Sequence, residues 1–209
     1  GNDVQDAEEA VKGSGPFSMR VPALPECLPR RGNGFSRTVS RALLGVWGWT
    51  IEGDLPSRPK MVAIVAPHTS NWDFIVGVLA MFAVGIRVRF LAKHTLFKGA
   101  LGAFMRWCGG MPVNREAPQG LVPQAVEAIE TAPAVFLAIT PAGTRSSTRP
   151  WKSGFYHIAV AARVPIFPVV FDGPARAIRF LPAFEPSGDY GADLPRLQAL
   201  YAGVRGIKP

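Results

Sequence analysis

The chain has 209 residues, of which 48% are hydrophobic and 18% charged, a composition typical of one globular domain and unlike that of a wholly disordered chain. Its 23 Lys and Arg against 15 Asp and Glu give a formal net charge of +8, which favours an anionic partner such as nucleic acid, anionic lipid or a phosphorylated substrate. The two cysteines, Cys27 and Cys108, lack the spacing of a zinc site or a disulfide framework, so we expect no metal and a reducing compartment.

Residues 1–18 are polar, acidic and Gly/Ser-bearing, and we interpret them as a disordered or vector-derived leader outside the fold. No secretory signal is visible after Met19, because Arg20 and three prolines interrupt the sequence before residue 30. We therefore expect a single domain over residues 19–209.

An amphipathic helix is predicted over Phe35–Thr50, where Arg37 and Arg41 lie among aromatic and aliphatic residues. This mixture suits an interfacial helix that lies on a membrane, and it equally suits a helix that packs an apolar stripe on the sheet. A second segment, Phe74–Ile86, is apolar on every face, which indicates burial or partial contact with lipid. It is shorter than the roughly 20 residues that a spanning helix needs.

The following part of the chain alternates short β-branched runs with helical patterns, which predicts an α/β fold with a mostly parallel central sheet and helices on both faces. The expected strands are Met61–Ala66, Arg87–Ala92, Met111–Val113, Ala134–Ile139 and Val164–Phe171. The expected helices lie near Trp72–Val84, Leu96–Trp107, Gly120–Glu130 and Gly154–Ala162. An extended segment and a short helix are expected between Ala175 and Val204.

Polar residues follow each predicted strand, and ligands of open α/β sheets bind outside the carboxyl ends of the strands. Loops are polar in general, so one such residue alone would carry little information. The residues that follow the five strands are His68; Lys93 and His94; Asn114 and Arg115; Thr144 and Arg145; and Asp172.

His68 and Asp73 are five residues apart, which is about 140° of rotation on a continuous helix and would place them on different faces. They can meet if His68 precedes a helix that Ser70 or Asn71 caps, with Asp73 in its first turn. Such a pair suits deprotonation of a substrate hydroxyl, with the imidazole as general base and the carboxylate holding its tautomer. Equally, Ser70 and Asp73 match a capping box, with His68 an ordinary loop residue.

The segment from His68 to Asp73 resembles the first motif of the glycerolipid and lysophospholipid acyltransferase superfamily, and further motifs follow in order through about residues 61–171. Each motif is short, but four in the correct order are specific. The second motif is matched by Lys93–Phe97 with Gly109–Arg115. The third is matched by Pro141–Ser146, followed by Trp151–Gly154, and the fourth is matched by Val164–Val170.

The resemblance implies transfer of a fatty acyl group from a coenzyme A or acyl-carrier-protein thioester, as co-substrate and without a cofactor, to a hydroxyl of a glycerolipid-like acceptor. It implies that His68 is the base and that Asp73 orients it. The residues expected to hold the acceptor headgroup or phosphate are Arg115, Gly143, Thr144 and Arg145, with Lys93 and Lys152 adding charge; surface lysines in contact with solvent are an equally good interpretation of the last two.

Position 142 departs from the family pattern, which carries Glu where this chain has Ala142. A methyl group cannot accept a hydrogen bond from an acceptor hydroxyl or pair with Arg145, so the contribution of the Glu is absent or supplied elsewhere. Three accounts remain open: a natural variant with a different acceptor, a deliberate inactivating replacement, or a chain that has lost catalysis.

The expected partner is a membrane lipid surface, with the chain bound peripherally to the cytoplasmic face of the inner membrane. The basic residues are dispersed and no groove-reading motif is present, so we expect no nucleic acid. A catalytically silent lipid-binding relative is the alternative to an enzyme. His157, on the predicted helix at Gly154–Ala162, is interpreted as a packed or capped core histidine rather than a catalytic one.

Overall fold

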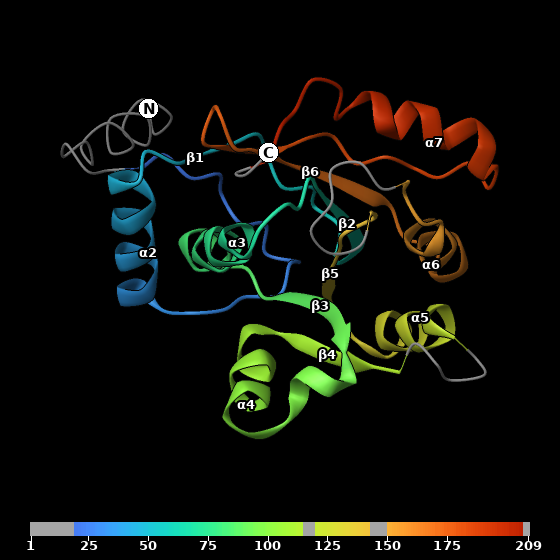
Figure 1. Cartoon of the computed structure of the whole chain (residues 1–209), viewed down its shortest axis with the longest axis horizontal. Coiled ribbons are helices and arrows are strands. Elements are labelled where there is room, and N and C mark those ends of the chain that lie inside the picture. Colours follow the sequence, from blue (N-terminus) through green and yellow to red (C-terminus); the bar gives the residue numbers. More distant parts are fainter. Residues whose placement is uncertain (1–18, 115–119, 143–149, 207–209) are drawn as a thin grey trace, which may run out of the picture.

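The computed structural model describes residues 19–114, 120–142 and 150–206, and these residues form an α/β fold around a seven-stranded sheet (Figure 1). Five strands, β2 to β6, run parallel; β7 is antiparallel to β6, and β1 pairs parallel with β7. The strand order is β1-β7-β6-β2-β5-β3-β4. The strands are β1 Thr50–Glu52, β2 Lys60–Ala66, β3 Val88–Lys93, β4 Gly110–Val113, β5 Val135–Ile139, β6 Ile166–Asp172 and β7 Ala177–Phe180.

The helices lie close to where the hydrophobic periodicity predicts them. They are α2 Gly34–Val46, α3 Asn71–Val84, the 3₁₀ helix η1 His94–Phe97, α4 Gly99–Cys108, α5 Leu121–Thr131, α6 Gly154–Ala162 and α7 Tyr190–Ala199. Two predictions need correction. The first helix ends at Val46 instead of Thr50, because Gly48 takes a left-handed conformation and the chain then enters β1. The predicted helix at Leu96–Trp107 is divided, because Lys98 is extended between η1 and α4.

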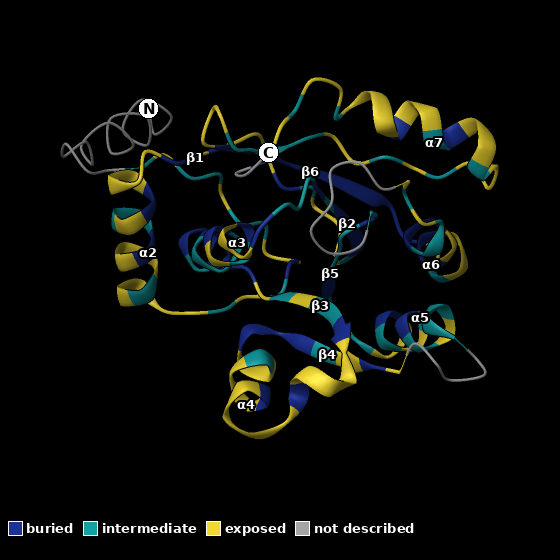
Figure 2. Ribbon diagram, viewed as in Figure 1, coloured by how far each residue is buried: buried dark blue, intermediate teal, exposed yellow. Residues whose placement is uncertain are grey.

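The central strands β2 and β6 are buried on both faces of the sheet, which explains why they are continuous apolar runs. Met61 and Ala63 of β2 point into a core that α3 covers, whereas Val62 and Ile64 point into a second core beneath α5, α6 and α7. Figures 1 and 2 show these two groups of helices on opposite sides of the sheet, with α4 beside the β4 edge. Full burial of a Val, Ile or Met side chain contributes about 1.5–3 kcal/mol.

Helix α2 packs on α3 and buries only a narrow stripe of its surface. Asn33 caps its N-terminus by accepting from the Ser36 backbone N–H at 2.9 Å, and Leu44 is fully buried. The Arg41 side chain donates to the Ala83 carbonyl at 2.9 Å, which joins α2 to the end of α3. The remaining face of α2 is exposed, so the helix both packs internally, on α3, and presents apolar side chains to solvent.

Helix α7 is fixed to α6 by a buried polar contact. The Tyr156 hydroxyl donates to Asp193 at 2.6 Å, and the Ser187 backbone N–H donates to the same carboxylate oxygen at 2.7 Å. Burial and this hydrogen bond raise the pKa of the Tyr156 phenol, so it remains a donor. The prediction that His157 is a core histidine is wrong. His157 is exposed on α6, although its neighbours Tyr156 and Ile158 are buried.

Candidate active site

His68 lies on the short loop that joins the central strand β2 to α3. Pro67 follows the strand, Ser70 is the N-cap residue of α3, and Asp73 lies in the first helical turn, 1% exposed. The His68 Nδ1 atom is 3.4 Å from Asp73 Oδ2. The structure therefore brings the two side chains together across the strand-to-helix turn, the arrangement that their spacing requires.

The Asp73 carboxylate is held in place by the backbone of the same loop. Its Oδ2 atom accepts the backbone N–H groups of Thr69 at 2.6 Å and Ser70 at 2.7 Å. The N-terminal end of a helix favours negative charge, which makes this first turn a suitable position for a buried carboxylate. Among the described residues, the second oxygen, Oδ1, and the Ser70 hydroxyl are buried without a hydrogen-bond partner. One carboxylate oxygen thus fixes the loop and faces the imidazole at once.

A pocket of about 220 Å³ opens beside His68, at the carboxyl ends of β2 and β5. Because parallel strands end at the same edge of the sheet, the loops after β2 and β5 meet there. Its described lining residues are Val65, Ala66, Pro67, His68, Thr140, Pro141, Ala142, Trp151, Gln198, Tyr201 and Val204. His68 is 19% exposed, which leaves its ring accessible from the pocket.

The other predicted site residues divide into two groups. Lys93 at the end of β3 and Lys152 are both exposed on the side of the sheet's carboxyl edge, and neither is among the described lining residues of the pocket. The Lys152 backbone N–H donates to the Pro141 carbonyl at 2.8 Å, which ties its segment to the turn after β5. Arg115, Gly143, Thr144 and Arg145 lie outside the described residues.

Several pocket residues carry no signal in the sequence. Trp151 belongs to the stretch behind the third motif, but Gln198, Tyr201 and Val204 come from α7 and the segment after it, beyond the last predicted motif. They reach the pocket only through the tertiary fold. In the described part of the chain, no group of three or more His, Cys, Asp or Glu side chains is arranged to hold a metal ion.

Comparison with known proteins agrees with the sequence motifs. The family model described as acyltransferase matches residues 50–172. Relatives named 1-acyl-sn-glycerol-3-phosphate acyltransferase include proteins from Streptococcus pneumoniae, 29% identical over 68% of this chain and 56% of the relative, and Cocos nucifera, 32% identical over 72% and 50%. The chain thus spans about half the length of these curated relatives.

The fold also resembles a solved structure. The crystal structure of the 1-acyl-sn-glycerophosphate (LPA) acyltransferase PlsC from Thermotoga maritima matches with a TM-score of 0.55 and 17% identity, over 82% of this chain and 80% of that one. At this identity the likeness concerns the fold. The family model covers more than half of the chain, including β2, α3 and the His68 loop, and the chain therefore belongs to the acyltransferase family.

Proposed function

We propose that this chain transfers a fatty acyl group from a thioester to a hydroxyl of a lysophosphatidic-acid-like acceptor, with His68 as the general base. The contact between His68 and the buried Asp73, beside a pocket, is the observation that carries the proposal. Membership of the acyltransferase family and the names of the relatives support the same reaction class.

The proposed reaction assigns a task to each nitrogen of the imidazole. Nδ1 faces Asp73, so Nε2 takes the proton of the acceptor hydroxyl while Asp73 stabilises the imidazolium that forms. The acceptor oxygen then bonds to the thioester carbonyl carbon, the carbon–sulfur bond breaks, and the leaving thiolate receives the proton from His68. The co-substrate is acyl-coenzyme A or an acyl-carrier protein, and the step needs no further cofactor.

Anchoring of the acceptor phosphate is assigned to the cationic residues of the motifs. Arg115 and Arg145 offer the forked geometry that suits phosphate, and Gly143 and Thr144 permit close approach of the backbone and a hydroxyl contact. Lys93 and Lys152, both exposed, add positive charge that attracts an anionic acceptor or donor.

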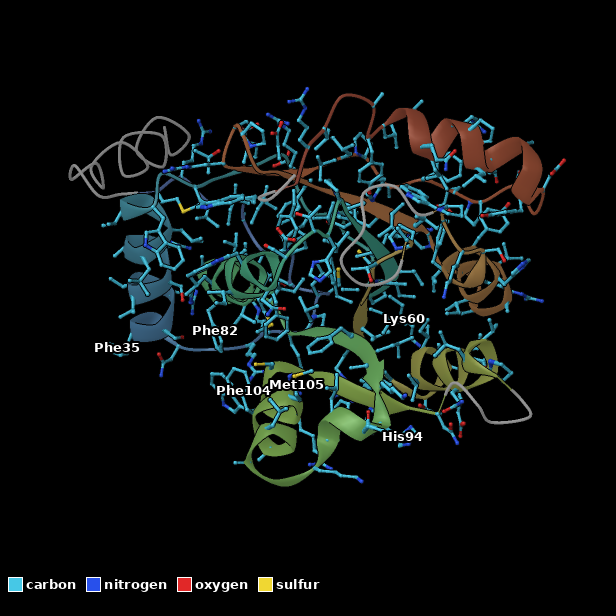
Figure 3. The ribbon with its side chains drawn as sticks, in the orientation of Figure 1. Phe35, Lys60, Phe82, His94, Phe104 and Met105 are labelled. Atoms are coloured by element: carbon cyan, nitrogen blue, oxygen red, sulfur yellow. The ribbon has the colours of Figure 1, made fainter. Side chains whose placement is uncertain are left out.

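A lipid acceptor also requires a route to a membrane surface, and an exposed apolar face on α2, α3 and α4 supports one. Ring contacts join the three helices. The ring centroids of Trp47, at the C-terminal end of α2, and Trp72 of α3 are 6.1 Å apart, and those of Phe82 of α3 and Trp107 of α4 are 5.4 Å apart. In Figure 3, the labelled Phe35, Phe82 and Phe104 lie along one side of the molecule. The exposed residues of this apolar face are Phe35, Val39, Leu43, Val46, Trp47, Trp72, Ile75, Leu101, Phe104 and Trp107.

The charges around the apolar face favour an anionic lipid surface. Neither α2 nor α4 contains Asp or Glu, whereas α2 carries Arg37 and Arg41, and α4 carries Arg106. Arg31 lies over the rings of Phe82 and Trp107, 5.2 and 4.8 Å from their centroids. Basic and aromatic side chains together suit peripheral binding to the cytoplasmic face of a membrane. No helix within the described ranges has both the length and the apolar character needed to cross a bilayer.

The activity is tested by incubating the purified chain with lysophosphatidic acid in mixed micelles and labelled acyl-coenzyme A or acyl-carrier protein. We expect phosphatidic acid as product and a loss of rate of about 10²–10⁴-fold on His68→Ala. His157→Ala is the matched control, because His157 is exposed on α6 and does not line the pocket.

The alternative is a chain that binds lipid without turning it over, an alternative that Ala142 favours because it gives the pocket only a methyl group. Binding of lysophosphatidic acid without product from either donor would establish the alternative. Equal activity of the wild-type chain and His68→Ala would contradict the assignment of the base.

A further inference from the structure

The pocket beside His68 has a wall that comes from outside the region matched by the family model. That match ends at residue 172, whereas Gln198, Tyr201 and Val204 line the same pocket as His68 and Ala142. Gln198 belongs to the last turns of α7, and Tyr201 and Val204 follow the helix. The C-terminal part of the chain therefore completes a site whose catalytic loop lies on β2.

This wall is fixed to the catalytic strand by direct contacts. The Tyr201 hydroxyl donates to the Ile64 carbonyl of β2 at 2.8 Å, and its ring lies 5.3 Å from that of Trp151. Burial raises the pKa of the Tyr201 phenol, so the group stays protonated as a donor. Further along, the Gly173 backbone N–H donates to the Arg205 carbonyl at 2.9 Å. The Tyr201 backbone N–H donates to the Gln198 carbonyl at 3.0 Å, so the backbone at Gln198 is tied through Tyr201 to β2.

Among the lining residues that the structure describes, the polar groups of the pocket are mostly uncharged. Its described lining residues include no Asp, Glu, Lys or Arg, and the Tyr201 hydroxyl is already bonded to β2. Thr140 and Gln198 remain as uncharged side chains that can bond a ligand. No hydrogen bond among the described residues involves the Gln198 carboxamide. Side chains of this kind suit an uncharged ligand group that carries oxygen atoms.

We propose that Gln198 is an acceptor-binding residue, whose carboxamide hydrogen-bonds the uncharged hydroxyl or ester oxygens next to the reacting hydroxyl. The proposal rests on the proposed acyl transfer. A carboxamide both donates and accepts, which matches a glycerol backbone better than a phosphate. Ala142 lines the same pocket with a methyl group, so Gln198 supplies a hydrogen-bonding function that position 142 lacks.

The test is steady-state kinetics of Gln198→Leu with lysophosphatidic acid and acyl-coenzyme A varied in turn. Leucine keeps a branched side chain, one bond shorter than that of glutamine, and removes its hydrogen bonds. We expect the KM for the acceptor to rise about tenfold, the effect of one or two lost hydrogen bonds. We expect kcat and the KM for the thioester to change less than about threefold, because the base and the donor site are untouched.

Arg196→Leu is the control on the same helix, because Arg196 is exposed and does not line the pocket. Its acceptor KM should stay within about twofold of the wild-type value, and both variants should keep the wild-type Tm within the range of surface substitutions. A matching rise in Arg196→Leu would show that disturbance of α7, and not loss of the carboxamide, causes the effect.

Two results would overturn the proposal while leaving the reaction intact. One is turnover with an unchanged acceptor KM in Gln198→Leu. The other is a rise in the thioester KM alone, which would assign the pocket to the acyl donor. Absence of turnover by the wild-type chain is a different result. It contradicts the proposed acyl transfer itself, and the proposed role of Gln198 in acceptor binding then falls with it.

Discussion

At the scale of single residues, Asp73 combines a structural and a chemical task. Its buried Oδ2 atom accepts two backbone N–H groups of the loop and also lies 3.4 Å from the His68 ring. A carboxylate in this position holds the loop that carries the base and selects the tautomer of the base. Replacement of Asp73 should therefore change both stability and rate, but by different amounts.

We predict that Asp73→Asn lowers the rate of acyl transfer by about 10³–10⁴-fold, because a neutral amide neither fixes the imidazole tautomer nor stabilises the imidazolium. The loss of stability should be about 0.5–2 kcal/mol, comparable to the loss of a helix cap. Acyl transfer and urea unfolding measure the two effects. Asp189→Asn is the control, because Asp189 caps α7 by accepting from the Ala192 N–H; a similar loss of rate there would contradict a specific role for Asp73.

Ala142 stands where the resemblance to the third motif leads us to expect Glu, and it lies on the pocket that His68 also lines. We predict that Ala142→Glu raises the rate about tenfold, because a carboxylate there favours the imidazolium and adds a hydrogen-bond acceptor for the ligand. Ala199→Glu, an exposed change near the end of α7, controls for the added charge. An unchanged or lower rate for Ala142→Glu would argue for a different mode of acceptor binding.

At the scale of elements, the segment that follows α7 lies in contact with the loop that carries His68. The backbone of Gly206 approaches Thr69, the residue after His68, so closely that an added Cβ would overlap the Thr69 side chain. Tyr201 holds the same segment on β2. The loop that carries His68 thus lies against a segment near the C-terminal end of the described residues.

We predict that Gly206→Ala lowers kcat about tenfold or more, because displacement of a catalytic group by about 1 Å can cost 10²-fold in rate. Gly34→Ala is the matched control, since a Cβ at Gly34 meets no atom within 4 Å. Kinetics and thermal unfolding of both variants provide the measurement. Full activity of Gly206→Ala would show that the segment does not position the loop.

At the scale of the whole molecule, the apolar face and the active-site pocket are built on separate parts of the same sheet. The apolar face uses α2, α3 and α4, and Figure 2 shows much of α2 and α4 exposed. The pocket uses the ends of β2 and β5 together with α7. Helix α3 links them, because its first turn holds Asp73 while Trp72 and Ile75 are exposed.

We predict that the chain sediments with vesicles containing anionic phospholipid and that higher salt weakens this binding, because screening reduces the attraction of the basic residues. The double variant Phe35→Ser/Leu101→Ser should bind about tenfold less tightly, since it removes two of the most exposed apolar side chains of the face. Leu200→Ser, exposed on the α7 side, is the control. Equal loss of binding in the control would contradict the assignment of the face.

The sequence by itself determined the features that depend on neighbouring residues. Short β-branched runs identified five of the seven strands and helical periodicity identified most of the helices, because both patterns are carried by residues that are neighbours in the sequence. The sequence also allowed His68 and Asp73 to meet across a strand-to-helix turn, with a capping box and an ordinary loop histidine as the other interpretation. The short strand β1 was not predicted, because a strand of three residues with only Ile51 buried is too short to show a pattern of apolar residues.

Only the tertiary structure decided which distant parts of the chain meet. It placed β2 between β5 and β6, so that the loops after β2 and β5 meet at one pocket, and it brought Tyr201 to Ile64 across 137 residues of sequence. It also decided which face of α2 packs on α3 and which face is exposed to solvent. These outcomes depend on how apolar faces of separate elements bury one another, and that pairing is a property of the whole packed core rather than of any local pattern.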